Sequence, residues 1–176
     1  MNLVLIGYRA AGKTTVGSRL APRLQMGFVD TDHLIETRCD TPIVDIVKSY
    51  GWDHFRKLEK RIIAEISVHD GLIIAPGGGA VLDTENIEML RKNGLIIWLK
   101  ADRQALVRRM NQDPRTSAQR PTLTGKGTME ELGEVMAHRD PIYEKAAEVQ
   151  VDTSSLDVEM VVETLQSILQ KRLGRG

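Results

Sequence analysis

The sequence predicts an α/β fold with a doubly wound parallel sheet, because short apolar runs alternate with longer segments of helical pattern. The runs at residues 3–6, 72–75 and 95–99 are continuously apolar, as strands are when helices cover both faces of a sheet. Weaker strand signals lie at residues 28–30 and 148–152. The order of strands and helices along the chain therefore indicates repeated β-α units.

Helical pattern is clearest over residues 52–68 and 158–173. Two further segments fit such a core less well. Residues 33–60 add helical pattern between the second and third strands, and residues 112–127 are rich in Pro, Gly, Ser and Thr. A loop as long as the second segment is usually functional or disordered. Pro141 is expected to interrupt a helix, because proline cannot donate a backbone hydrogen bond.

Composition limits the class of protein. The length fits a single domain, residues 1–176, and the 24 basic and 24 acidic side chains cancel. The balance indicates neither nucleic acid nor a membrane as a general partner. A single cysteine, Cys39, excludes an internal disulfide framework. We find no signal-peptide pattern and no run near the roughly 20 apolar residues of a membrane span, so we expect a cytoplasmic protein.

The tract "GYRAAGKTT", residues 7–15, matches the phosphate-binding pattern G-x-x-x-x-G-K-[ST] between a predicted strand and a predicted helix. Gly7 and Gly12 let backbone N–H groups converge on phosphate oxygens, and the next helix turns its positive dipole end toward the same anion. Lys13 is predicted to reach the β- and γ-phosphates, and the Thr14 hydroxyl to ligate Mg²⁺. The motif predicts a bound nucleotide but identifies no acceptor.

Two carboxylates follow the second predicted strand in "DTD". Asp30 and Asp32 alternate with Thr31, so in an extended chain both would face one side, at the sheet edge where α/β proteins bind ligands. One could hold the water shell of a metal ion while the other accepts a proton from an attacking hydroxyl. The structural alternative is that Asp30 ends the strand and Asp32 caps the next helix. These residues alone favour neither reading.

Three consecutive glycines, Gly77, Gly78 and Gly79, follow the third predicted strand in "APGGGA". Such a run is costly in chain entropy and needs a physical reason. Close approach of a ligand to bare backbone is one reason, and a tight turn from strand to helix is the other. Both interpretations remain open at the level of sequence.

Three arginines are candidates for binding an anionic ligand, because guanidinium groups make forked contacts with carboxylate and phosphate. Arg56 lies on a predicted helix with Glu59 on the same face, so a surface ion pair is its structural alternative. Arg120 lies within residues 112–127, where it could be a solvated loop charge. Arg139 precedes Pro141, where it could be a charge at a helix end.

The tracts "LIGYRAAGKTTVG", "FVDTDHLIE", "FRKLE", "APGGGAV", "QRPTLTGK" and "RDPIYEKAA" occur in this order. Together they resemble the shikimate kinase family over almost the whole chain. The resemblance implies transfer of the γ-phosphoryl group of ATP to the 3-hydroxyl of shikimate, in the route to chorismate and aromatic compounds. It also implies a fold like that of the nucleoside monophosphate kinases, with five parallel strands ordered 2-3-1-4-5. Residues 33–60 would bind shikimate, and residues 112–125 would form a lid over ATP.

The resemblance assigns roles on the nucleotide side. Lys13 and the loop amides would hold the phosphates, Thr14 would ligate Mg²⁺, and Asp30 would lie near the metal. Arg120 would reach the phosphates from the lid, and Arg109 with residues 153–156 would cradle adenine. The implied cofactor-binding residues are Gly7, Ala10, Ala11, Gly12, Lys13, Thr14, Thr15, Arg109 and Arg120.

On the acceptor side, the resemblance implies that Asp32 contacts the shikimate hydroxyls and is the candidate base. Arg56 and Arg139 would grip the shikimate carboxylate, and Gly78 would donate its N–H to the substrate from among the three glycines. The implied catalytic residues are Asp32, Lys13 and Arg120. Ala75 and Pro76 depart from many members of the family, which carry Ser or Thr there. A monomer is expected.

Other classes of protein fit the residues less well. A gluconate kinase-like enzyme or another small-metabolite kinase would share the phosphate loop, and a nucleoside monophosphate kinase would need a site for a base and a second phosphate. A GTP-dependent switch would need an N-K-x-D segment to read guanine, which the chain lacks. A non-catalytic nucleotide-binding module is the last alternative, but Lys13, Thr14, Asp30 and Asp32 show no sign of decay.

Overall fold

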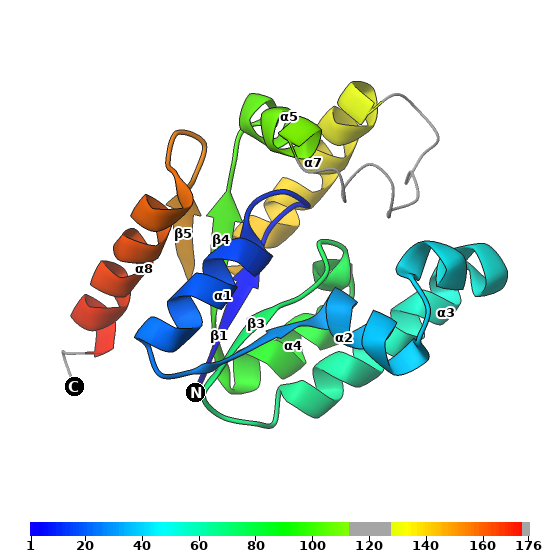
Figure 1. Cartoon of the computed structure of the whole chain (residues 1–176), viewed down its shortest axis with the longest axis horizontal. Helices are drawn as coiled ribbons and strands as arrows, with labels where there is room; N and C mark the ends of the chain where they lie inside the picture. Colours follow the sequence, from blue (N-terminus) through cyan, green and yellow to red (C-terminus); the bar gives the residue numbers. More distant parts are fainter. Residues whose placement is uncertain (113–127, 174–176) are drawn as a thin grey trace.

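The computed structural model describes residues 1–112 and 128–173 and contains a five-stranded sheet. All strand pairs are parallel, and the spatial order is β2-β3-β1-β4-β5, as the sequence analysis predicts (Figure 1). The strands are β1 (Asn2–Ile6), β2 (Gly27–Asp30), β3 (Leu72–Ala75), β4 (Gly94–Lys100) and β5 (Val149–Asp152). Each predicted strand is therefore confirmed to within one or two residues.

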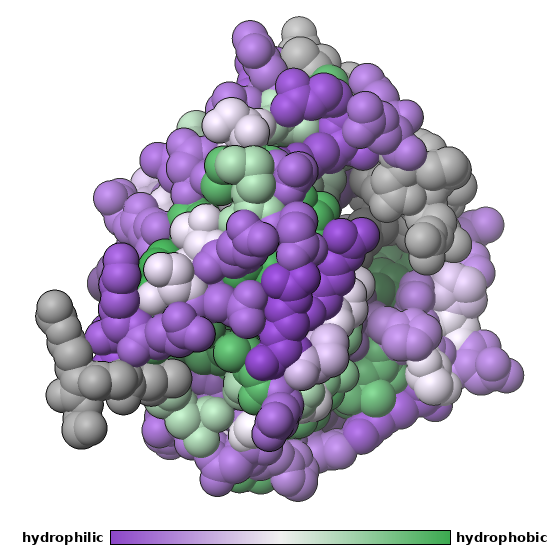
Figure 2. Space-filling model, turned by 60° about the vertical axis from the view of Figure 1, so that its left-hand side comes forward, coloured by the Kyte–Doolittle hydropathy of each residue, from purple (hydrophilic) through white to green (hydrophobic). Residues whose placement is uncertain are grey.

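Helices connect the strands and cover both faces of the sheet. They are α1 (Lys13–Arg23), α2 (Thr31–Cys39), α3 (Ile43–Ile66), α4 (Thr84–Lys92), α5 (Arg103–Gln112), α7 (Thr128–Ala146) and α8 (Val158–Leu173), with a short 3₁₀ turn η1 (Ala80–Leu82). None of the described helices has an apolar stretch that could cross a bilayer. On the face seen in Figure 2, hydrophilic side chains cover most of the surface.

Two hydrophobic cores follow from the alternation of side chains along the central strand. Leu3 and Leu5 of β1 point into one core with α1, α5 and α8, whereas Val4 and Ile6 point into the other with α3, α4 and α7. All four side chains are at most 2% exposed. A strand buried on both faces must be continuously apolar, which is the pattern that predicts the parallel sheet.

Two helices differ from the predicted boundaries. Helix α3 begins at Ile43, but Gly51 breaks its geometry with φ 81° and ψ 169°, so the helix predicted over residues 52–68 corresponds to the second part of α3. Only glycine readily adopts this backbone conformation, so the helical pattern on either side belongs to two segments. The expectation that Pro141 interrupts a helix is wrong, because α7 runs through it. The buried side chains of Tyr143 and Ala146 anchor the last turns, and this packing offsets the lost backbone hydrogen bond.

The candidate residues gather where the strands end. The phosphate loop follows β1, Asp30 ends β2, and the three glycines follow β3. Because parallel strands carry their carboxyl ends to the same edge, these three loops meet above the centre of the sheet. The edge above β2, β3 and β1 is therefore the candidate site.

Candidate active site

The phosphate loop is a tight turn between β1 and α1 in which both glycines have positive φ angles. Gly7 has φ 147°, and a Cβ atom there would lie 2.7 Å from the carbonyl oxygen of Leu99. Gly12 has φ 96° and is the left-handed N-cap residue of α1. The loop therefore keeps its bare backbone at the start of a helix, which is the arrangement that binds phosphate.

Lys13 is held against this loop. Its side chain is only 8% exposed, and Nζ donates to the carbonyl oxygens of Gly7 at 2.9 Å and Tyr8 at 3.0 Å. These two hydrogen bonds hold the Lys13 side chain beside the turn. The cation predicted to contact the β- and γ-phosphates is thus already in place at the loop.

Asp30 connects two elements through its two carboxylate oxygens. Oδ2 accepts a hydrogen bond from the Thr14 hydroxyl at 2.5 Å, and Oδ1 accepts from the backbone N–H groups of Asp32 at 3.0 Å and His33 at 3.2 Å. Asp30 is therefore the N-cap of α2, and the alternative in which Asp32 caps this helix is wrong. The hydroxyl and the carboxylate lie together at the start of α1.

The extended geometry expected for "DTD" is also wrong, because Thr31 and Asp32 already belong to the first turn of α2. A helix separates successive side chains by about 100°, so Asp30 and Asp32 do not share one face by alternation. Instead Asp30 contacts Thr14, whereas Asp32 lines a pocket beside the glycine triplet. The two carboxylates serve two neighbouring sites.

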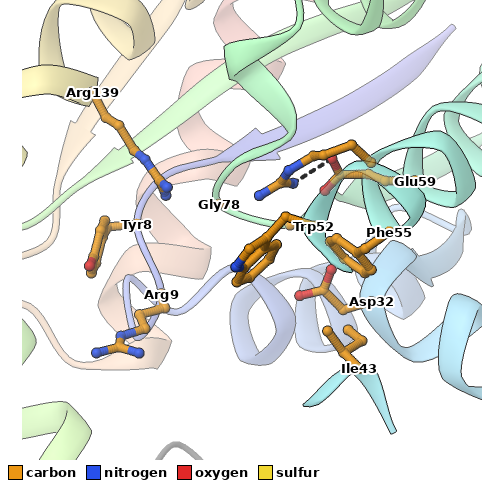
Figure 3. Close-up of a pocket in the computed structure, with 11 residues that line it drawn as sticks. Tyr8, Arg9, Asp32, Ile43, Trp52, Phe55, Glu59, Gly78 and Arg139 are labelled. Carbon is orange, nitrogen blue, oxygen red and sulfur yellow. Dashed lines mark hydrogen bonds and ion pairs between the residues drawn. The ribbon is translucent and has the colours of Figure 1, made fainter. Parts of the chain in front are cut away.

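The pocket beside the phosphate loop brings together residues that are far apart in the sequence (Figure 3). Asp32 comes from α2, Arg56 from α3 and Arg139 from α7, and Gly77 and Gly78 form its floor. The full lining is Tyr8, Arg9, Asp32, Ile43, Trp52, Phe55, Arg56, Glu59, Gly77, Gly78 and Arg139. A carboxylate and two guanidinium groups thus converge on one space, which we call the acceptor pocket.

Arg56 forms an ion pair that is not a surface pair. Its Nη1 donates to Oε2 of Glu59 at 2.6 Å, and the Glu59 side chain is 0% exposed. The guanidinium carbon also lies 5.4 Å from the ring centre of Trp52 and 5.2 Å from that of Phe55. Aromatic faces attract cations, so three contacts fix the direction of Arg56. The expected ion pair with Glu59 is therefore present, but it is partly buried, since the Arg56 side chain is 32% exposed and that of Glu59 is fully buried.

Glu59 has a pKa raised from 4.5 to about 7, because burial penalises its charged form more strongly than Arg56 stabilises it. Asp32 raises this pKa further, whereas Arg139 lowers it. Oε1 of Glu59 has no hydrogen-bond partner among the described residues. The carboxyl group is therefore poised to change charge near neutral pH at the wall of the acceptor pocket.

We expect Glu59→Gln to change how stability depends on pH. Because the folded-state pKa of Glu59 lies above its ordinary value, the folded protein holds a proton that the unfolded chain has released, and stability falls as pH rises from 4.5 to about 7. Glutamine does not titrate, so this loss of stability with rising pH is absent from the variant. Relative to the variant, the wild type should lose about 2–3 kcal/mol in free energy of unfolding between about pH 5 and about pH 8.

Denaturant titrations at the two pH values measure this difference. Glu88→Gln is the matched control, because Glu88 is exposed on α4 and its variant should follow the wild type at both values. Parallel pH profiles of Glu59→Gln and the wild type would contradict the assigned titration.

The glycine triplet is needed for a reason that neither sequence interpretation contains. A Cβ atom on Gly77 would lie 2.6 Å from Oδ1 of Asp32 and 2.8 Å from Oε1 of Glu59, and one on Gly79 would collide with the guanidinium of Arg56. The missing side chains leave room for the charged groups of the pocket. This close approach also explains why the triplet directly follows β3.

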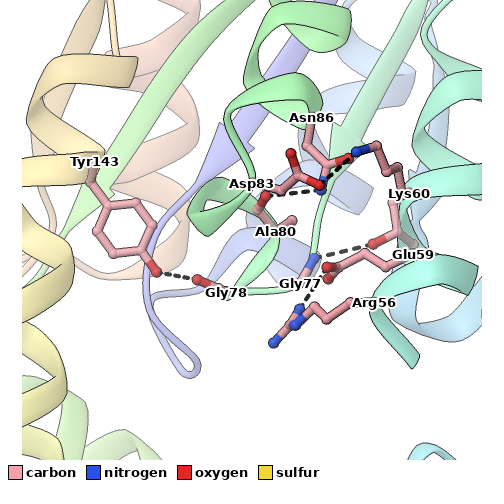
Figure 4. Close-up of polar contacts among 10 residues, drawn as sticks. Arg56, Glu59, Lys60, Gly77, Gly78, Ala80, Asp83, Asn86 and Tyr143 are labelled. Atoms are coloured by element: carbon pink, nitrogen blue, oxygen red, sulfur yellow. Dashed lines mark hydrogen bonds and ion pairs between the residues drawn. The ribbon is translucent and has the colours of Figure 1, made fainter. Parts of the chain in front are cut away.

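Two hydroxyl groups hold the triplet in place, and Figure 4 shows the contact that Tyr143 makes. Oγ1 of the buried Thr31 accepts from the N–H of Gly77 at 3.1 Å. The Tyr143 hydroxyl donates to the carbonyl oxygen of Gly78 at 2.6 Å, and burial raises the pKa of this phenol, so it keeps its proton. The turn is thus tied to α2 on one side and to α7 on the other.

Arg139 lies on α7 and is only 8% exposed. Its guanidinium carbon lies 5.8 Å from the centre of the Tyr8 ring, and the group also faces the oxygen of Tyr143. In the part of the chain that the structure describes, no carboxylate forms an ion pair with it. A buried guanidinium group without an ion pair suits an anionic ligand, because burying a charge is costly unless it is paired.

A second cavity, of about 360 Å³, lies on the other side of the phosphate loop. It is lined by Ala10, Ala11, Gly12, Thr15, Val16, Arg109, Gln112, Thr153, Leu156, Asp157, Val158 and Val161. Arg109 donates to the hydroxyl of Thr153 at 3.1 Å and to its carbonyl oxygen, so α5 is fixed to the loop after β5. The loop residues and the residues expected near adenine therefore line one cavity.

Arg120 and nearly all of the expected lid, residues 112–125, lie outside the described residues. Gln112 is described and is the last residue of α5.

Several residues of the site are not among those predicted. Thr31, Tyr143, Trp52 and Phe55 hold the predicted residues in place, and Tyr8 and Arg9 bring the phosphate loop into the wall of the acceptor pocket. Helical spacing could have found two of them, because Trp52 lies one turn before Arg56 and Tyr143 lies one turn after Arg139. No local pattern predicts the others.

Comparison with known proteins identifies the family. The family model described as shikimate kinase matches residues 9–170. The chain belongs to the shikimate kinase family. It is 42% identical over 175 residues to a shikimate kinase of Syntrophus aciditrophicus, covering 93% of this chain and 88% of that protein. It is 40% identical over 176 residues to that of Symbiobacterium thermophilum, covering both chains completely.

Solved structures agree with this membership. A shikimate kinase from Acinetobacter baumannii in complex with shikimate superposes with a TM-score of 0.88 at 30% identity, covering 99% of this chain and 93% of that chain. The resemblance inferred from sequence tracts is therefore confirmed, together with the fold. Since the family consists of kinases, the acceptor pocket and the phosphate loop belong to an enzyme.

Proposed function

We propose that this chain transfers the γ-phosphoryl group of ATP to the 3-hydroxyl of shikimate. Membership of the family makes it an ATP-dependent kinase of shikimate, in the pathway to aromatic amino acids. The observation that carries the proposal for this site is the convergence of Asp32, Arg56 and Arg139 beside the phosphate loop. Shikimate is a small carboxylate with three hydroxyls, so it requires cations at one end and a proton acceptor at the other.

On the acceptor side, Arg56 and Arg139 bind the shikimate carboxylate. Both arginines line the pocket, Arg139 points into it in Figure 3, and each guanidinium can form forked hydrogen bonds that fix orientation as well as affinity. The N–H of Gly78 donates to the substrate from the same turn, beside Gly77 and Gly79. Asp32, which lines the same pocket, contacts a hydroxyl of the substrate. The region of residues 33–60 thereby acts as the shikimate-binding part of a single domain.

On the donor side, Lys13 and the amides of residues 7–15, including those of Ala10, Ala11 and Gly12, bind the phosphates. Thr15 and Arg109 line the cavity that accommodates the nucleoside. Arg120 reaches the phosphates from a lid formed by residues 112–125. The positions of Lys13 and Arg109 in the structure support this arrangement, and the role of Arg120 follows from the family resemblance.

Mg²⁺ fits the pair formed by Thr14 and Asp30. A hydroxyl and a carboxylate oxygen 2.5 Å apart are hard oxygen donors of the kind that Mg²⁺ prefers. When bound with ATP, Mg²⁺ neutralises charge on the phosphate oxygens. Asp30 is suited to this position because its other oxygen is engaged in capping α2.

The positions of the side chains support the following mechanism. Asp32 accepts the proton of the 3-hydroxyl as the hydroxyl oxygen forms its bond to the γ-phosphorus, and the bond from that phosphorus to the leaving oxygen of ADP breaks. Lys13 balances negative charge on the phosphate oxygens during transfer. Arg56 and Arg139 keep the acceptor in line, because phosphoryl transfer depends mainly on positioning and charge neutralisation.

The expected partners are shikimate and ATP. We further propose that the protein works as a monomer in the cytoplasm and binds neither nucleic acid nor membrane, in keeping with its balanced charge. A gluconate kinase-like activity has no support in the comparisons reported above, all of which are to shikimate kinases.

An ADP-release assay tests the function across shikimate, gluconate and nucleoside monophosphates. Turnover is expected with shikimate alone, and removal of Mg²⁺ by a chelator should abolish it. Clear turnover with another acceptor, and none with shikimate, would overturn the proposal. Activity that persists without any divalent cation would overturn the role of Thr14 and Asp30 as metal ligands.

A further inference from the structure

Tyr8 is a phosphate-loop residue whose side chain belongs to the acceptor pocket. It directly follows Gly7, is 5% exposed, and lines the pocket together with Asp32, Arg56 and Arg139. The phosphate-loop pattern leaves this position open to any residue, so the motif does not account for an aromatic ring there. The ring therefore needs an explanation on the acceptor side.

Two guanidinium groups lie against this ring. The guanidinium carbon of Arg139 is 5.8 Å from the ring centre, and that of Arg9 is 6.0 Å from it. In Figure 3 the two groups appear on opposite sides of Tyr8, with Arg139 above and Arg9 below. A cation within about 6 Å of an aromatic face is attracted to it, and the attraction grows when water is excluded. Arg139 is buried, so this contact helps to decide its direction.

The backbone of Tyr8 contacts the nucleotide side of the site. Its carbonyl oxygen accepts a hydrogen bond of 3.0 Å from Nζ of Lys13, the cation placed at the phosphates. One residue thus touches the nucleotide lysine through its backbone and the carboxylate-binding arginine through its ring. Phosphate oxygens would compete with the Tyr8 carbonyl for Lys13, so nucleotide binding acts on the same residue whose ring contacts Arg139.

We propose that Tyr8 is a positioning residue that orients Arg139 and couples acceptor binding to nucleotide binding. This inference rests on the proposed function, because it takes Arg139 to be a ligand of the shikimate carboxylate. Tyr8 thus has a role in the acceptor site that is separate from phosphate binding. A purely structural tyrosine would instead serve only the hydrophobic cluster that it shares with Leu99 and Leu106.

The test compares Tyr8→Leu and Tyr8→Met, which remove the aromatic face, with Tyr8→Phe, which keeps it. The aliphatic variants should raise the KM for shikimate about 5- to 10-fold, as expected for loss of a partly desolvated cation–π contact, with little change in the KM for ATP. Tyr8→Phe should remain close to the wild type in both constants. Two aliphatic variants are used so that a folding defect in one leaves the comparison intact.

Binding titrations supply the second measurement. The Kd of shikimate is determined with and without a non-hydrolysable ATP analogue, and the wild-type values should differ by about 5-fold or more. In Tyr8→Leu the ratio should fall to one. A wild-type ratio of one would overturn the coupling.

Three other outcomes would overturn the positioning role. They are an unchanged KM for shikimate in both aliphatic variants, equal losses for ATP and shikimate, and a Tyr8→Phe variant as impaired as Tyr8→Leu. Wild-type turnover of shikimate is measured first and tests the proposed function. Failure at that step is therefore distinct from failure of the inference about Tyr8.

Discussion

Asp32→Asn is expected to lower kcat by about 10²- to 10⁴-fold, the usual contribution of a positioned general base. The amide is nearly the same size as the carboxylate but accepts no proton, so the acceptor pocket should keep its shape. Nucleotide affinity should be unchanged, because Asp32 faces the acceptor pocket and Asp30, not Asp32, contacts Thr14. Steady-state kinetics and nucleotide titration of the purified variant measure the two quantities.

Asp70→Asn is the matched control for this variant. Asp70 is exposed before β3, at the opposite end of the sheet, where it pairs with the N-terminal amine. Its variant should keep wild-type kcat. Near-normal turnover in Asp32→Asn would remove Asp32 from the mechanism, and loss of nucleotide binding would show that the carboxylate supports the phosphate loop instead.

Arg139→Ala is expected to raise the KM for shikimate on the order of 100-fold, corresponding to about 3 kcal/mol of lost binding. The effect is large because Arg139 is buried and no carboxylate of the described residues forms an ion pair with it, so its expected partner is the substrate. The KM for ATP should change little. Arg139→Lys should show an intermediate loss, because lysine restores the charge without the forked geometry.

Arg61→Ala provides the control for charge alone, since Arg61 is exposed on α3 and lies outside both cavities. Its KM for shikimate should equal that of the wild type. Equal losses of shikimate and ATP affinity in Arg139→Ala would refute the assignment of Arg139 to the acceptor carboxylate.

Features that depend on local sequence could be predicted. The phosphate loop requires glycine and lysine at set positions, and buried strands require continuous apolar runs, so the loop and the five strands were found within one or two residues. Predictions failed where tertiary contacts outweigh local preference. Pro141 was expected to interrupt a helix, but the packing of Tyr143 and Ala146 carries α7 through it.

The two aspartates show the same limit. Alternation in "DTD" predicted a shared face, whereas the chain turns into α2 immediately after Asp30 and sends the carboxylates to different partners. Whether the chain is extended or helical after a strand depends on which carboxylate caps the next helix. A three-residue sequence does not decide this. Capping by Asp30 is what frees Asp32 for the acceptor pocket.

The sequence by itself determined the class of fold, the nucleotide loop and, through tracts distributed along the chain, the resemblance to shikimate kinases. Only the tertiary structure decided which charges are buried and how they are held. Glu59 lies buried in the pocket wall with a raised pKa, and the glycines leave space for Arg56 and the carboxylates of Asp32 and Glu59. The ring of Tyr8 connects the phosphate loop with Arg139. The physical reason is that burial and charge pairing depend on residues brought together from separate elements, which spacing along a chain does not specify.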